Sequence, residues 1–91
     1  MLDVEDLKLA VGTSGDAYED ELEGIAEAAM LDMENVGIAR QDNDALYDHA
    51  VRMYVKGHFD TTSSDADDCR RIYDGLKGTM KLSNKYREAI V

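Results

Sequence analysis

The side chains in this chain that could carry out chemistry are two histidines, one cysteine and many carboxylates. His49 and His58 are too far apart to act as a metal-binding pair on one helical face, and Cys69 has no second thiol at ligand spacing. The acidic runs at residues 42–44 and 65–68 lack the alternate spacing and the glycine of an EF-hand loop. We therefore expect no metal site, and we interpret these groups as surface imidazoles, a core thiol, helix caps and solvated faces.

Catalysis of hydrolysis or nucleotide transfer would need a positioned nucleophile or a phosphate-binding loop. The sequence has no nucleophile elbow and no glycine loop of the kind that cradles phosphate. We predict that the protein is not an enzyme and uses no cofactor.

Charge is divided unevenly along the 91 residues, whose formal net charge is −10. Residues 1–39 carry eleven acidic side chains and a single base, Lys8, whereas residues 40–91 carry nine of each sign. The stretch from Arg70 onward has six bases and two acids. A protein this acidic is a poor nucleic-acid binder, because phosphate binding needs clustered Lys and Arg. One molecule should have an acidic end and a basic end.

Apolar residues recur at helical spacing in four segments separated by Gly, Asp, Asn and Ser clusters. We predict helices over 4–11, over 16–36 with a capping pair formed by Asp16 and Glu19, over 44–56 behind Asp42 or Asn43, and over 65–82. The fold class is then all-α: a small four-helix domain with a short N-terminal helix.

Residues 1–82 should form the domain, and residues 83–91 a flexible C-terminal tail or arm. Gly75 and Gly78 disfavour the fourth helix unless they allow a close backbone approach. The expected core includes Met33, Met53, Tyr54, Tyr73 and Met80. The single cysteine and the lack of a leader predict a reducing cytosolic origin, and no apolar run is long enough to cross a membrane.

Residues that lie off the apolar stripes are the candidates for subunit contacts. The acidic candidates are Glu23, Glu27 and Glu34, and the basic candidates are Arg70, Arg71, Lys77 and Lys81. Met30, Tyr47 and Val51 lie beside the stripes and are the candidates for apolar surface that another subunit covers. Within one subunit the acidic and basic sets could instead pair with each other.

Several short segments follow one another in a characteristic order. These segments are Val-Glu-Asp-Leu-Lys at 4–8, Asp-Glu-Leu at 20–22, Ala-Ala at 28–29, Ala-Val-Arg-Met-Tyr-Val-Lys-Gly-His-Phe at 50–59, Ile-Tyr-Asp-Gly-Leu-Lys at 72–77 and Lys-Tyr-Arg at 85–87. In order, spacing and length the chain resembles the head-tail connector, or head-completion adaptor, proteins of long-tailed phages.

The resemblance implies a structural virion protein, made in the cytoplasm of the bacterial host. Its copies would form a ring, a dodecamer in this family, between the portal protein and the tail or next neck protein. Genomic DNA would pass through this ring without specific binding, helped by the acidic character of the wall.

An acidic DNA mimic or small regulatory inhibitor is the alternative, since it could use the same carboxylates to occupy a basic site on another protein. The basic C-terminal stretch favours the ring, because a head-to-tail contact would join an acidic surface to a basic one.

Overall fold

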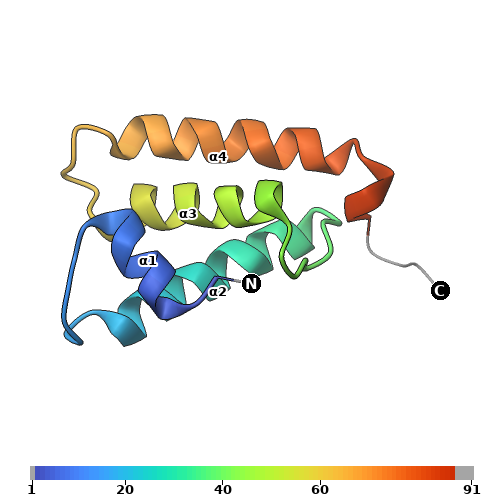
Figure 1. The fold of residues 1–91 in the computed structure, drawn as a ribbon. Helices are drawn as coiled ribbons and strands as arrows, with labels where there is room; N and C mark the ends of the chain where they lie inside the picture. Colours follow the sequence, from blue (N-terminus) through green and yellow to red (C-terminus); the bar gives the residue numbers. More distant parts are fainter. Residues whose placement is uncertain (1, 88–91) are drawn as a thin grey trace.

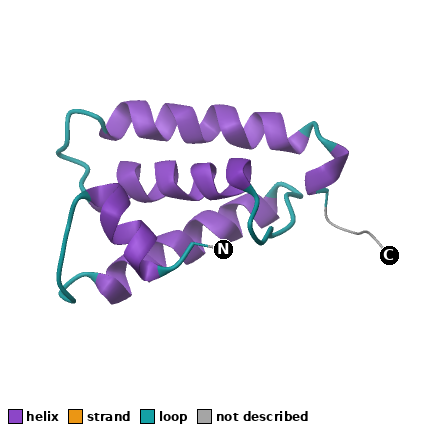
Figure 2. Ribbon diagram, viewed as in Figure 1, coloured by secondary structure: helices purple, strands orange, loops and turns teal. Residues whose placement is uncertain are grey.

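The computed structural model describes residues 2–87, and these form a small all-α domain (Figures 1 and 2). Its helices are α1 (Val4–Val11), α2 (Glu19–Asn35), α3 (Ala45–Phe59) and α4 (Ala66–Lys81), followed by the short 3-10 helix η1 (Asn84–Tyr86). No strand is present in residues 2–87 apart from one isolated bridge. The predicted all-α class and the order of the four helices are confirmed.

Helix α3 lies at the centre of the fold, with α4 along one side and α1 and α2 on the other (Figure 1). Six of its residues are buried, and they face several directions: Tyr47, Ala50, Val51, Met53, Val55 and Gly57. Four of the five predicted core residues, namely Met33, Met53, Tyr73 and Met80, are buried, while Tyr54 is half-buried against the same core.

The start of α1 is a capping box. The Asp6 amide donates to Asp3 Oδ1 over 3.0 Å, and the Asp3 amide donates to Asp6 Oδ2 over 3.1 Å. Gly12 ends the helix in the left-handed region, with φ 74°.

Helix α2 begins at Glu19, so the predicted start and capping pair at Asp16 are wrong. The Glu19 amide donates instead to the Asp16 carbonyl, which makes a turn before the helix. The side-chain carboxylates of Asp16 and Glu19 both interact with Lys8. Lys8 Nζ donates a hydrogen bond to Glu19 and lies 3.7 Å from Asp16 Oδ1. Lys8 is itself buried, and the hydrogen bond to Glu19 raises the pKa of its amine.

The N-cap of α3 is Asp44, and neither Asp42 nor Asn43 takes this role. Asp44 Oδ2 accepts from the Tyr47 amide over 3.0 Å. Asn43 has a φ of 56° and so belongs to the preceding turn.

Helix α4 runs without a break through Gly75 and Gly78, and a Cβ at either position would meet no atom within 4 Å. The close backbone approach lies instead at Gly57 of α3. A Cβ there would come within 2.7 Å of Arg70 Cγ and 3.3 Å of the Ala66 carbonyl oxygen. Arg70 Nη1 also donates to the Gly57 carbonyl over 2.7 Å, which ties α4 to the end of α3.

Part of the predicted tail belongs to the domain. Tyr86 is buried in the core, its carbonyl accepts from the Ala39 amide over 2.7 Å, and its hydroxyl donates to Asp44 Oδ2 over 2.8 Å. Lys85 Nζ bonds the other oxygen of Asp44 over 2.5 Å. The predicted boundary after residue 82 is therefore too early, because a buried tyrosine holds residues 83–87 in place. The rest of the predicted tail, residues 88–91, lies outside the described residues.

Substitution of Gly57 by alanine should lower the free energy of unfolding by about 1 to 3 kcal/mol, because the new methyl group overpacks the α3–α4 contact. The control is Gly75→Ala, which adds a methyl group in open space and should raise stability by up to about 1 kcal/mol. Urea unfolding of the three proteins measures both effects. A stabilised Gly57→Ala protein would contradict the close contact.

Asp44 should make the free energy of unfolding depend on pH. The hydrogen bond from Lys85, followed by those from the Tyr47 amide and the Tyr86 hydroxyl, lowers the pKa of Asp44 to about 2. Since the folded pKa is below the ordinary value, this stabilisation is complete above about pH 4 and is lost as the pH falls toward 2.

Asp44→Asn keeps a cap acceptor but removes the charge, so it should cost about 1 to 2 kcal/mol at pH 7, and this cost should decline as the pH falls through 2. The control is Asp42→Asn, an exposed carboxylate with no hydrogen-bond partner among residues 2–87. Unfolding curves at a series of pH values test this, and parallel curves for wild type and Asp44→Asn would refute it.

Candidate functional site

The three acidic candidates on α2 differ in whether they form ion pairs within the chain. Glu23 is exposed and forms no ion pair with any described residue. Glu27 and Glu34 both bind Arg40, which follows the turn after α2: Arg40 Nε donates to Glu34 Oε1 over 2.9 Å and Nη1 to Glu27 Oε1 over 3.2 Å. The hydrogen bond from Arg40 lowers the pKa of Glu27. Only Glu23 among these three carries an unpartnered charge.

The basic candidates on α4 divide in the same way. Arg70 is half-buried and holds the Gly57 carbonyl and the Asp67 carboxylate. Arg71 is exposed and forms an ion pair with Asp68 over 3.2 Å within one helical turn. Such exposed ion pairs contribute little to the free energy of unfolding. Lys81 is exposed without an ion pair among the described residues.

Lys77 turns inward and binds Asp32 of α2, with Nζ 2.9 Å from Oδ2. The Tyr73 hydroxyl donates to the same Asp32 oxygen over 2.5 Å. This hydrogen bond and then Lys77 lower the pKa of Asp32, while burial and the neighbouring carboxylate raise the pKa of Tyr73. Here an acid of the first half and a base of the second half do pair within one subunit.

An open hollow of about 310 Å³ lies beside this pair and includes Tyr54 and His58. Their rings stack with centroids 4.0 Å apart, and His58 Nδ1 is 2.8 Å from the Tyr54 carbonyl oxygen. The two other bases of the hollow, Arg70 and Lys77, already hold Asp67 and Asp32. The residues around this hollow therefore connect α2, α3 and α4. Because both bases are already paired with carboxylates, the hollow offers little unpaired positive charge to an anion.

Tyr47 and Val51 are core residues, with 2% and 3% of their surface exposed, so the prediction that they form apolar surface is wrong. The reason is that α1 and α2 cover the side of α3 from which they project. Met30 is half-buried, and all three line one small hollow together with Leu2. The Tyr47 hydroxyl has no hydrogen-bond partner among the described residues, and burial raises its pKa to about 12.

A larger groove runs between α1 and α2. Its volume is about 360 Å³, and it shares Leu2, Ala26 and Met30 with the small hollow. Its other lining residues are Asp3, Val4, Leu7, Glu23 and Glu27. The groove therefore has an apolar floor and acidic side chains along its α2 side. We call it the α1–α2 groove.

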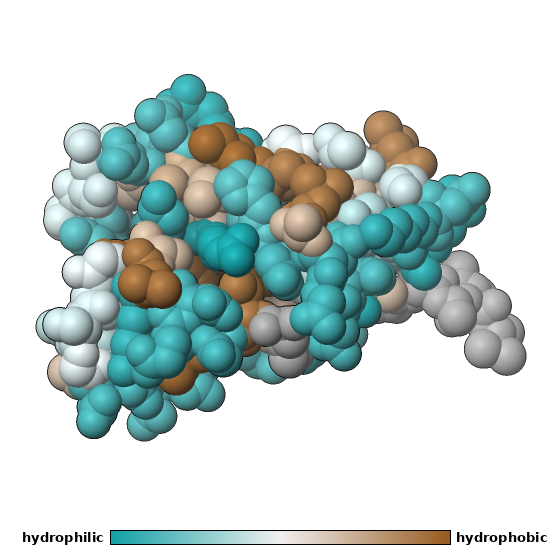
Figure 3. All heavy atoms as spheres, in the orientation of Figure 1, coloured by the Kyte–Doolittle hydropathy of each residue, from teal (hydrophilic) through white to brown (hydrophobic). Residues whose placement is uncertain are grey.

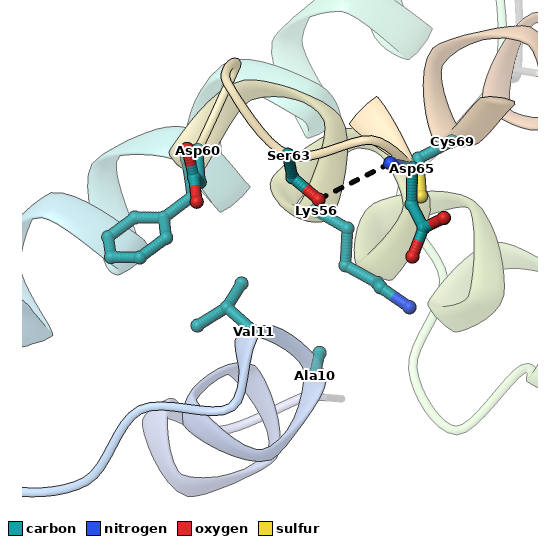
Figure 4. A pocket seen from close by; sticks show the side chains of 8 residues that line it. Ala10, Val11, Lys56, Asp60, Ser63, Asp65 and Cys69 are labelled. Atoms are coloured by element: carbon teal, nitrogen blue, oxygen red, sulfur yellow. Dashed lines mark hydrogen bonds between the residues drawn. The ribbon is translucent and has the colours of Figure 1, made fainter. Parts of the chain in front are cut away.

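Another hollow, of about 220 Å³, opens where the ends of α1 and α3 meet the loop before α4 (Figure 4). Val11 and Phe59 form its apolar side, Lys56 crosses it, and the buried Cys69 lies at its wall. Ser63 Oγ accepts from the Asp65 amide over 3.3 Å, which is a turn interaction. None of its lining residues is a histidine that could serve as base to the serine or the thiol.

In comparisons with known proteins, no family model, no curated protein and no solved structure matches the chain. Among residues 2–87, no three His, Cys, Asp or Glu side chains converge so that they could hold a metal ion. None of the helices described combines the length and apolar character needed to cross a bilayer.

The hydroxyls of Tyr73 and Tyr47 provide a matched test of these contacts. Tyr73→Phe removes the donor to Asp32 and should cost about 1 to 2 kcal/mol of unfolding free energy. Tyr47→Phe removes a hydroxyl that has no described partner and should leave stability unchanged or raise it by up to about 1 kcal/mol. Thermal and urea unfolding measure both. A larger loss for Tyr47→Phe than for Tyr73→Phe would contradict these contacts.

Proposed function

We propose that this protein is a structural subunit that works by assembly, and specifically that it is a head-tail connector of a long-tailed phage. Its copies would form a ring, a dodecamer as in the family it resembles, between the portal protein and the tail or next neck protein. The ring would extend the channel through which genomic DNA passes. The protein would be made in the bacterial cytoplasm and reside in the virion.

The observation that carries this proposal is the pair of unlike surfaces that one subunit exposes. Glu23 leaves unpartnered negative charge on α2, and Lys81 leaves unpartnered positive charge at the end of α4. Unlike surfaces on one molecule favour a heterologous contact, which closes into a ring if the rotation between copies allows it.

Exposed apolar side chains support the same proposal. Leu9, Leu31, Ile72 and Leu82 are 81%, 51%, 45% and 87% exposed on a domain with a small core. Figure 3 shows such apolar surface over α4 and near α1, set among polar side chains. Single exposed apolar side chains are common on monomers, but side chains of this kind are available to a partner subunit or to the portal.

Several carboxylates are neutralised internally, which favours a ring subunit over the DNA mimic. Glu27, Glu34 and Asp32 hold Arg40 and Lys77. A mimic needs its carboxylates free to replace phosphates, whereas a channel wall needs only a net negative field that repels DNA.

Electron microscopy of the protein mixed with the portal of the same phage tests the proposal. We expect a ring on the portal, and its occupancy should fall as salt rises, because exposed ion pairs are screened. A protein that leaves the portal bare at low salt, yet displaces DNA from a DNA-binding enzyme, would contradict the connector role and indicate a mimic.

Charge reversal refines the same experiment. Arg71→Glu with Lys81→Glu should weaken ring formation without unfolding, since neither base is buried in the domain. Reversal of Arg70 and Lys77 is a poor test, because both hold partners in their own subunit. The control is Arg52→Glu with Lys56→Glu on α3, two bases without ion pairs among residues 2–87. Equal weakening by both double variants, each shown to be folded by circular dichroism, would contradict a specific contact of α4.

A further inference from the structure

Leu82 is the large apolar side chain with the greatest exposure among residues 2–87, at 87%. Its backbone is nevertheless held in place. The Leu82 amide donates to the Thr79 carbonyl over 3.2 Å, and the next amide, of Ser83, donates to the Met80 carbonyl over 3.1 Å. Three residues further on, the buried Tyr86 anchors the chain. Leu82 therefore stands on ordered backbone, so little conformational entropy would be lost if a partner covered it.

The α1–α2 groove has the complementary properties. Its floor is apolar and open, and its volume of about 360 Å³ can accept a leucine side chain. Glu23 on its α2 side is exposed and has no ion-pair partner among the described residues. Lys81, adjacent to Leu82, is exposed and equally free of an ion pair. An apolar side chain next to a free base thus matches an apolar floor next to a free acid.

We infer that Leu82 of one copy inserts into the α1–α2 groove of a second copy, where Lys81 pairs with Glu23. The contact cannot form within one copy, because α1 and the end of α4 lie toward opposite ends of the molecule (Figure 1). The two surfaces are different, so each copy can use both at once and the contact propagates from copy to copy. Its closure into a ring rests on the proposed function; the contact itself does not.

The contact area is small, so single contacts should be weak, and a ring should become stable when many of them form together on a common platform. Self-association in free solution is then measurable at high protein concentration and low salt. Sedimentation equilibrium over a concentration series is the appropriate measurement.

Leu82→Ser should weaken self-association about tenfold or more, because burial of a leucine side chain is lost. Leu9→Ser is the control, since Leu9 is 81% exposed but is not part of the groove or of the α4 end. A wild-type protein that stays monomeric at millimolar concentration, or an equal effect of the two serine variants, would overturn the inference.

A charge exchange tests the ion pair. Glu23→Lys alone and Lys81→Glu alone should each weaken self-association, and the protein with both changes should recover most of it, because the pair is restored with its signs exchanged. If the double variant is as weak as the product of the single effects, the two residues do not meet.

Disulfide trapping gives a readout that does not depend on the strength of the contact. In a Cys69→Ala background, proteins with Met30→Cys alone and Leu82→Cys alone should form a mixed dimer on oxidation with oxidised glutathione. One protein with both changes should give a ladder beyond the dimer. Dimers of Leu82→Cys with itself, formed as readily as mixed dimers, would overturn the groove as the partner.

The two proposals fail separately. Recovery of trapped ladders together with a bare portal would refute the connector role and leave the self-contact standing. A ring that forms on the portal equally well with Leu82→Ser and with each single charge change would refute the self-contact and leave the connector role standing.

Discussion

The packing of α3 between α4 on one side and α1 with α2 on the other is the constraint on which the rest of the structure depends. A helix of 15 residues has six buried positions that do not lie on one stripe, so a single partner helix cannot cover them. Helix α4 covers one side, and α2 with the short α1 covers the other. The α3–α4 side approaches most closely at Gly57, where the absence of a side chain leaves room for Arg70. The short N-terminal helix is thus a necessary part of the core.

Polar interactions then connect the helices through the half-buried Asp32 and the buried Asp44. Asp32 receives Tyr73 and Lys77 and so joins α2 to α4. Asp44 caps α3 and also holds Lys85 and Tyr86. A buried carboxylate such as Asp44 is stable only when it accepts several hydrogen bonds. These contacts occupy Lys77 and Lys85, two of the nine bases of residues 40–91.

The same use of charge limits what is left for partners. Of the seven charged residues considered as subunit contacts, Glu23 and Lys81 alone have neither an ion pair nor a buried side chain among the described residues. A surface contact based on one free acid and one free base needs apolar area to reach useful strength. Leu82 and the α1–α2 groove provide apolar surface next to each of these charges. The proposed self-contact rests on this combination of apolar surface and unpaired charge.

The sequence by itself determined the helix class, the order of the helices and most of the core, because hydrophobic spacing and the residues that cap and end helices act locally. It also determined that one end of the chain is acidic and the other basic. Only the tertiary structure decided which side chains are free. Tyr47 and Val51 lie beside the main stripe, yet they are buried because a second layer covers α3. Lys77 and Glu27 lie off the stripes, yet both are paired within the chain, with Asp32 and with Arg40. Spacing along one helix cannot reveal a partner that folding brings from another segment.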